Sequence, residues 1–118
     1  MTKYLISFPS AAMNLSAEDL QASADAAHAV VEEAKAAGVW VFGGGIDETV
    51  PPVRVTADGT VTEDTYQQTS RLDGGFTVLE VPSREAALGW AAKLADACRC
   101  AQEVRAFHYD PPADDRPG

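Results

Sequence analysis

The stretch that decides the fold is Gly74–Val81, with the sequence GGFTVLEV. Its apolar positions Phe76, Val78 and Val81 predict a well-buried strand. The two glycines at its start let backbone or a ligand approach closely. A polar run from Glu63 to Asp73 leads into the strand, so we expect a central strand with a wide polar loop at its mouth, which is a natural place for a site.

The length and composition predict one domain. The chain has 118 residues, and 46% of them are hydrophobic, which is enough to bury a core without support from disulfides or metals. We expect residues 1–109 to form this domain. Residues 110–118 are rich in proline and aspartate and have nothing to bury, so they are expected to form a disordered tail.

The charge excludes two classes of partner. Eighteen acidic residues against nine basic ones give a net charge of −9, and no cluster of lysine and arginine occurs that would bind nucleic acid or an anionic membrane. The apolar run near the N-terminus is too short for a signal peptide, and no run approaches the length of a membrane span. We therefore expect a cytoplasmic protein.

The cysteine spacing indicates neither a disulfide nor a metal site. Cys98 and Cys100 flank a single arginine, a spacing at which an ordinary disulfide is strained, and a second metal-binding pair is missing. Both are interpreted as reduced thiols. We predict no metal and no cofactor.

Hydrophobic periodicity places the elements along the chain. An apolar run at 3–8 predicts a first strand, and Ser16 is a good N-cap for a long helix. That helix has an apolar stripe of Leu20, Ala24, Ala27, Val31 and Ala34. The elements expected are strands at 3–8, 39–42, 75–81 and 102–109, helices at 17–37 and 83–97, and a hairpin at 53–63 around Asp58-Gly59.

The order of these elements predicts a ferredoxin-like α+β sandwich, in which an antiparallel sheet is covered on one face by both helices. Side chains alternate along a strand, so Trp40, Phe42, Phe76 and Val78 cannot all point at the helices. Some of them must face outward. Pairing of two sheets in a homodimer is the simplest way to bury them.

By order and spacing, several motifs across residues 3 to 109 resemble the DGPF branch of the YCII-related proteins. They are Gly38–Ile46 (GVWVFGGGI), Val53-Arg54-Val55 with Asp58-Gly59, and Gly74-Gly75-Phe76 followed by Ser83, Glu85, Ala86, Leu88 and Trp90. The resemblance implies a ferredoxin-like fold that dimerises into an α+β barrel, an architecture that supports many different chemistries.

The chain also departs from that family pattern. The namesake Asp-Gly-Pro-Phe falls on Glu63-Asp64-Thr65-Tyr66, the usual Lys-Glu pair becomes Ser70-Arg71, and Gly44 replaces a glutamate. The catalytic histidine that the resemblance implies falls nearest Ala27, one place from His28. If the replaced residues are functional in that family, the resemblance implies that this chain has changed or lost the family's function around the loop from Glu63 to Asp73.

Seven residues are the candidates for a site. His28 and Asp73 are the candidate acid–base catalysts, since an imidazole titrates near neutral pH and a carboxylate in a dry cleft has a perturbed pKa. A half-buried histidine on a helix flank and solvated loop acids are the ordinary interpretations of the same residues. The candidate ligand-binding residues are Trp40, Glu63, Tyr66, Arg71 and Phe76.

Two functions follow from these observations. The first is binding of a small apolar or aromatic metabolite in a cleft between helix and sheet, with acid–base catalysis as an extension. The second is a non-catalytic regulatory or interaction module, of the type that the resemblance associates with sigma factors. Whether the protein is an enzyme is left open by the sequence.

Overall fold

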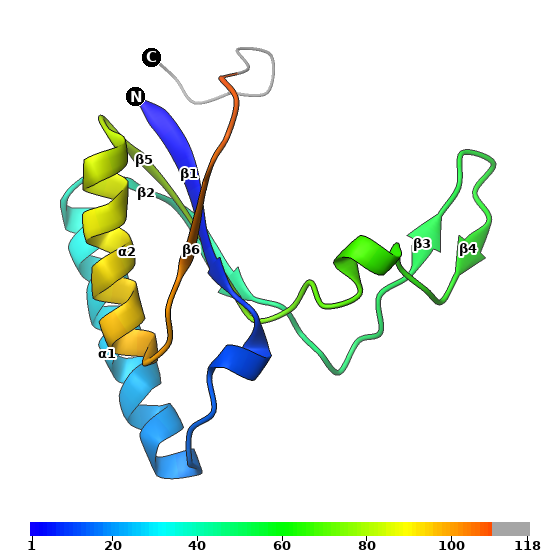
Figure 1. The fold of residues 1–118 in the computed structure, drawn as a ribbon, viewed down its shortest axis with the longest axis horizontal. Helices are drawn as coiled ribbons and strands as arrows, with labels where there is room; N and C mark the ends of the chain where they lie inside the picture. Colours follow the sequence, from blue (N-terminus) through cyan, green and yellow to red (C-terminus); the bar gives the residue numbers. More distant parts are fainter. Residues whose placement is uncertain (110–118) are drawn as a thin grey trace.

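The strand that begins at Gly75 lies inside a four-stranded antiparallel sheet (Figure 1). The computed structural model describes residues 1–109. Its elements in chain order are β1 (Thr2–Phe8), η1 (Ser10–Ala12), α1 (Ala17–Ala36), β2 (Trp40–Gly45), β3 (Arg54–Val55), β4 (Val61–Thr62), η2 (Gln67–Thr69), β5 (Gly75–Val81), α2 (Arg84–Cys98) and β6 (Glu103–Ala106). The predicted tail at 110–118 lies outside the described residues.

The sheet has the strand order β2-β5-β1-β6, and every neighbouring pair is antiparallel. β1 pairs along its whole length with β5, from Thr2 opposite Val81 to Phe8 opposite Gly75. Both helices lie on one face of the sheet (Figure 1). This order and layering are those of an α+β fold and are compatible with the predicted ferredoxin-like sandwich.

The core lies between the sheet and α2. Every second residue of β1 and β5 faces the helices, and Ile6, Leu79 and Val81 are almost completely buried there. From α2, Ala87 and Leu94 complete this layer. The second helix, predicted at 83–97, thus packs on the sheet through these residues.

Both helices begin where their sequences predicted. The Ser16 hydroxyl accepts a hydrogen bond from the Asp19 amide at 3.2 Å, and the Ser83 hydroxyl accepts one from the Ala86 amide at 3.1 Å. Each hydroxyl satisfies an amide that has no partner within its helix. Gly38, with φ of +76°, follows the end of α1 as expected.

The apolar stripe of α1 is buried at only one end. Of the five predicted positions only Ala34 is buried, whereas Leu20 remains 44% exposed. Near its start, α1 is instead tied to α2 by the buried Ser23 hydroxyl, which donates to the Ala97 carbonyl at 2.7 Å. The remaining apolar side chains of this half face a cleft rather than close-packed core.

β2 differs from the strand that was expected at 39–42. It starts at Trp40, shifts register between Trp40 and Phe42, and continues through all three glycines to Gly45. The irregularity in the ladder therefore lies before the glycines, and the glycines themselves pair with β5. β6 is likewise shorter than predicted and covers only Glu103–Ala106.

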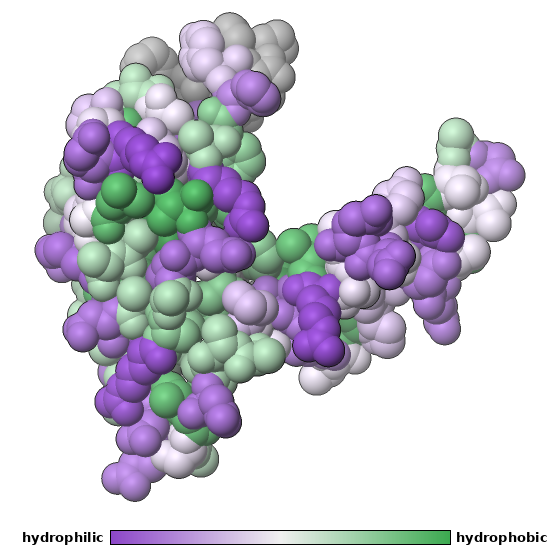
Figure 2. Space-filling model, in the orientation of Figure 1, coloured by the Kyte–Doolittle hydropathy of each residue, from purple (hydrophilic) through white to green (hydrophobic). Residues whose placement is uncertain are grey.

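Residues 46–73, here called the arm, project from the end of the sheet (Figure 1). The arm carries the predicted hairpin, shortened to two residues in each strand, and Gly59 at its turn has φ of +89°. Hydrogen bonds from the Thr56 hydroxyl and from the Thr60 amide lower the pKa of Asp58 in this turn to about 2. Figure 2 shows the arm standing away from the body of the domain.

The arm makes the molecule less compact than most chains of its length. The radius of gyration is 16.0 Å, against roughly 13.5 Å expected for a compact domain of this size. Apolar side chains of the arm are exposed to solvent, namely Val50, Val53, Val55, Val61, Tyr66 and Leu72. A two-stranded hairpin is only marginally stable in isolation. Within residues 1–109 of one chain, these apolar side chains of the arm are left uncovered.

Within residues 1–109, neither helix combines the length and the apolar character that crossing a membrane would require.

Candidate functional site

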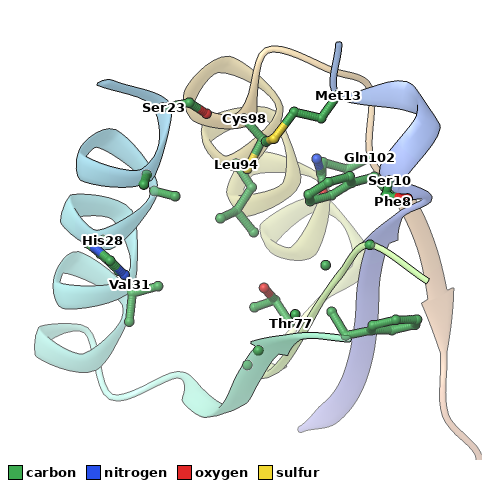
Figure 3. Close-up of a pocket in the computed structure, with 18 of the residues that line it drawn as sticks. Phe8, Ser10, Met13, Ser23, His28, Val31, Thr77, Leu94, Cys98 and Gln102 are labelled. Carbon is green, nitrogen blue, oxygen red and sulfur yellow. The ribbon is translucent and has the colours of Figure 1, made fainter. Parts of the chain in front are cut away.

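A cleft of about 630 Å³ opens between the N-terminal half of α1, the end of α2 and the helix-facing side of the sheet (Figure 3). Its lining is mainly apolar. Met13, Val31 and Leu94 contribute from the helical side, while Phe8 and Trp40 contribute from the sheet. A concave, mostly apolar cavity of this size is typical of a small-molecule site.

The floor of the cleft is made by glycine. Cross-strand partners share a face of the sheet, and Gly43 pairs with Thr77 while Gly45 pairs with Gly75. Thr77 and Gly75 lie on the same face of β5 as the buried Leu79. Three positions that would otherwise send side chains toward α1 therefore carry none, which leaves the space beneath the helix open.

Two of these glycines also make room for the aromatic walls. A Cβ atom at Gly43 would lie 2.5 Å from Cη2 of Trp40, and one at Gly75 would lie 2.6 Å from Cε1 of Phe8. The indole and the phenyl ring can rest on the sheet only because these Cβ atoms are missing. Gly45 is different, since a Cβ there would be 3.6 Å from its nearest neighbour, an ordinary contact.

The polar groups of the cleft are few. His28 lines it from α1, and Glu48 lines it from the root of the arm. The Ser10 hydroxyl donates a hydrogen bond to Oε1 of Glu48 at 3.1 Å. Gln102 lies nearby and donates through Nε2 to the Cys100 carbonyl at 3.3 Å. With Thr77, which also lines the cleft, these groups offer a ligand one carboxylate, one imidazole, one amide and two hydroxyls, and the Ser23 hydroxyl is already bonded to the Ala97 carbonyl.

Cys98 also lines the cleft and, like Cys100, is a free thiol, as predicted. Burial raises the pKa of the Cys98 thiol above its ordinary value, and the neighbouring Cys100 raises it further. Burial raises the pKa of Cys100 as well. Both side chains are therefore protonated at neutral pH and are poor nucleophiles.

We expect Cys98 to react with iodoacetamide at least roughly fivefold more slowly than free cysteine at neutral pH, because only the thiolate reacts and burial also restricts access. Its rate against pH is measured in the Cys100→Ser variant, and the Cys98→Ser variant reports Cys100 as the less buried control. The folded chain holds these protons more tightly than the unfolded chain, so the free energy of unfolding falls as pH rises above the ordinary thiol pKa. The burial argument would be contradicted if Cys98 reached half of its maximal reaction rate at a lower pH than free cysteine does.

The structure brings three of the seven predicted site residues to the cleft. His28, Trp40 and Phe76 line it, although Phe76 also borders a second groove on the opposite face of the sheet. Asp73 and Arg71 border only that second groove. His28 and Asp73 therefore do not face each other across one cavity.

Asp73 has a different task in the structure. Its Oδ1 accepts a hydrogen bond from the Ser10 amide at 3.0 Å. Because the hydroxyl of the same serine donates to Glu48, Asp73 fixes the loop that presents Ser10 to the cleft. Asp73 thus acts on the cleft by positioning Ser10 and does not line it.

Tyr66 and Glu63 lie on the arm, away from the cleft. The Tyr66 ring is 65% exposed and lies 5.4 Å below the Arg54 guanidinium, and Glu63 is exposed. Residue type, and a position in the loop that leads into β5, were the reasons to expect them at a site. The loop instead continues outward along the arm, which carries both residues away from the mouth of the strand (Figure 1).

The sequence analysis missed Glu48, Ser10 and Phe8, which come from segments without a motif. The alternation of glycine on one face, at Gly43, Gly45 and Gly75, was a usable signal for the cleft. Period-two glycines on a helix-facing surface predict a hollow.

The second groove has about the same volume, about 630 Å³, and lies between the arm and the uncovered face of the sheet. Arg71 and Arg105 border it together with Asp73 and Glu103, and Arg105 is 3.2 Å from Glu103. The two arginines of this groove offset its two carboxylates. The cleft has the Glu48 carboxylate and no lysine or arginine among its lining residues. Within residues 1–109, no three side chains of His, Cys, Asp or Glu gather closely enough to hold a metal ion.

The chain was compared with models of known protein families and with curated proteins, and neither comparison gives a match. The likeness to YCII-related proteins thus rests on the quoted motifs alone.

Proposed function

We propose that this protein binds a small apolar or aromatic molecule in the cleft beneath α1. The observation that carries this proposal is the glycine floor at Gly43, Gly45 and Gly75, flanked by the Trp40 and Phe8 rings. At Gly45, where a Cβ would make only an ordinary contact, a core that lacked a ligand would gain stability from a side chain. Two aromatic rings beside backbone without side chains instead match the shape of a planar or elongated apolar ligand.

A binding panel tests this proposal. Neutral aromatic and aliphatic compounds are screened by thermal shift and by chemical-shift changes in the amides of β2 and α1. A ligand at ten times its Kd adds about 1.4 kcal/mol, which raises Tm by roughly 5 °C for a domain of this length. Absence of any shift over a broad panel, or shifts confined to the arm, would overturn the proposal.

Acid–base catalysis is the extension of this function, and His28 is its candidate residue. His28 is the only histidine among the described residues that line the cleft. Once a ligand that turns over is found, His28→Ala should reduce kcat by about 100-fold or more while leaving Kd nearly unchanged. His108→Ala is the matched control, because His108 does not line the cleft. An unchanged kcat in His28→Ala would remove this residue from the mechanism.

We also assign the chain to the DGPF branch of the YCII-like domains, with a homodimer of the α+β barrel type. The uncovered sheet face supports the dimer, since Phe42 is 63% exposed there. The exposed valines of the arm add to the surface that a second copy would cover. Exposed apolar side chains on an uncovered sheet face are typical of an interface.

Light scattering at micromolar concentration should give twice the monomer mass. Phe42→Glu places a charge on the uncovered face and should shift the protein to monomer. Leu88→Glu is the control, because Leu88 is exposed on α2, in the layer on the other side of the sheet. A monomeric wild-type protein would rule out the dimer while leaving the cleft unaffected.

A further inference from the structure

The charges at the cleft have one sign. Glu48 is the only carboxylate among the described residues that line it, and none of those residues is a lysine or an arginine. The chain as a whole carries a net charge of −9, so the long-range field adds to the local negative potential. His28 is the single lining residue that can carry a positive charge.

Glu48 is held in place at this site. Its Oε1 accepts the hydrogen bond from Ser10, and Ser10 is itself fixed by the backbone bond to Asp73. Glu48 is exposed, and within residues 1–109 no lysine or arginine forms an ion pair with it. A carboxylate positioned by a hydroxyl at the mouth of an apolar cleft is a natural partner for a cationic group.

The charged groups of Lys35, Arg71, Arg99 and Arg105 do not line the cleft, and Arg99 is paired with Asp19. The Lys35 ammonium lies 5.8 Å from the centre of the Trp40 ring, but it does not line the cleft and is 3.5 Å from the Glu32 carboxylate. Arg71 and Arg105 border the groove on the opposite face of the sheet. A carboxylate ligand in the cleft would therefore meet Glu48 without a guanidinium or an ammonium to offset the repulsion.

We infer that the ligand of the cleft is an amine, with its ammonium group at Glu48 and its apolar body over the glycine floor between Trp40 and Phe8. This inference rests on the proposed small-molecule function and names the charge class of the ligand. Neutral compounds with the same apolar part bind more weakly than the amine, and carboxylates with that part bind most weakly of the three.

The test compares three probes of one shape, namely 2-phenylethylammonium, 2-phenylethanol and phenylacetate. Their affinities are measured by calorimetry or NMR titration at about 20 mM salt, where exposed charges interact over distances of about 20 Å. We expect the ammonium probe to bind roughly three- to fivefold more tightly than the alcohol, as for an exposed ion pair, and the carboxylate to bind more weakly than the alcohol by a similar factor. At about 0.5 M salt these differences should shrink to less than twofold.

Substitution of Glu48 locates the effect. Glu48→Gln keeps the size of the side chain and should bring the ammonium and alcohol probes to equal affinity. Glu63→Gln makes the same change of charge on the arm and should preserve the preference, since Glu63 does not line the cleft. Unchanged binding of the alcohol in both variants shows that the cleft itself is intact.

The possible outcomes separate this inference from the function on which it rests. If the alcohol binds but the ammonium probe binds no more tightly, or if the preference survives Glu48→Gln, the amine assignment is overturned and the binding function stands. If phenylacetate binds most tightly, the amine assignment is overturned as well. If none of the three probes binds but neutral compounds of the panel do, the assignment again fails alone. If nothing binds to the cleft, both fail.

Discussion

Replacement of Gly74 by alanine is expected to lower the free energy of unfolding by at least about 3 kcal/mol, a large fraction of the stability of a small domain. Gly74 has φ of +83°, which strains any residue with a side chain. A Cβ there would also lie 2.7 Å from the Ser10 amide nitrogen and closer still to the Phe8 carbonyl oxygen. These are backbone atoms at the end of β1, so no rotamer change relieves the overlap.

Gly59→Ala is the matched control for this prediction. Gly59 has φ of +89°, but a Cβ there would meet nothing within 4 Å. Gly59→Ala should therefore lower the free energy of unfolding only by the strain of the left-handed conformation, about 1 kcal/mol. Urea denaturation of both variants measures the difference. Equal costs at the two positions would show that the crossing of β1 over Gly74 is not close-packed.

Gly45→Leu is expected to weaken binding of a neutral apolar ligand by at least tenfold, because the new side chain occupies the floor of the cleft. A Cβ at Gly45 has only an ordinary contact, with the Gly74 carbonyl at 3.6 Å, and its φ is not positive. Removing a glycine from a strand stabilises it by about 0.5–1 kcal/mol. The variant should therefore fold at least as well as the wild type while losing its ligand.

Gly44→Leu provides the control on the neighbouring residue. Gly44 pairs with Phe76, so its Cβ would point to the opposite face of the sheet, 3.8 Å from the Phe42 ring. Binding in the cleft should survive this change. NMR titration of both variants with the same probe measures the contrast. Wild-type affinity in Gly45→Leu would mean that ligands do not use the glycine floor.

Much of the fold was predictable because its signals are local. The caps at Ser16 and Ser83, the turn at Gly59 and the alternation in β5 each depend on a few neighbouring residues. The element order then restricted the sheet to few topologies. The exposed start of α1 was not predictable in this way, because Leu20 fits an apolar stripe whether it faces core or cleft.

The candidate site was predicted only in part. His28, Trp40 and Phe76 were named from residue type and strand position, and they do line the cleft. Asp73 was placed there because it precedes β5, but its carboxylate is used to hold Ser10. The contribution of Glu48 depends on the direction in which the arm leaves β2, and no short-range pattern encodes that direction.

The pairing of Phe8 with Gly75 determines how long a loop must close during folding. Nearly all of α1, β2 and the arm lie between these two partners, so the central strand pair forms only after a long loop has closed. The entropy of closing a loop grows with the logarithm of its length, so removing residues 53–63 would change that term by only a few tenths of a kcal/mol. The length of the arm is therefore nearly free to vary in folding terms, so folding alone does not fix how far the arm extends from the sheet.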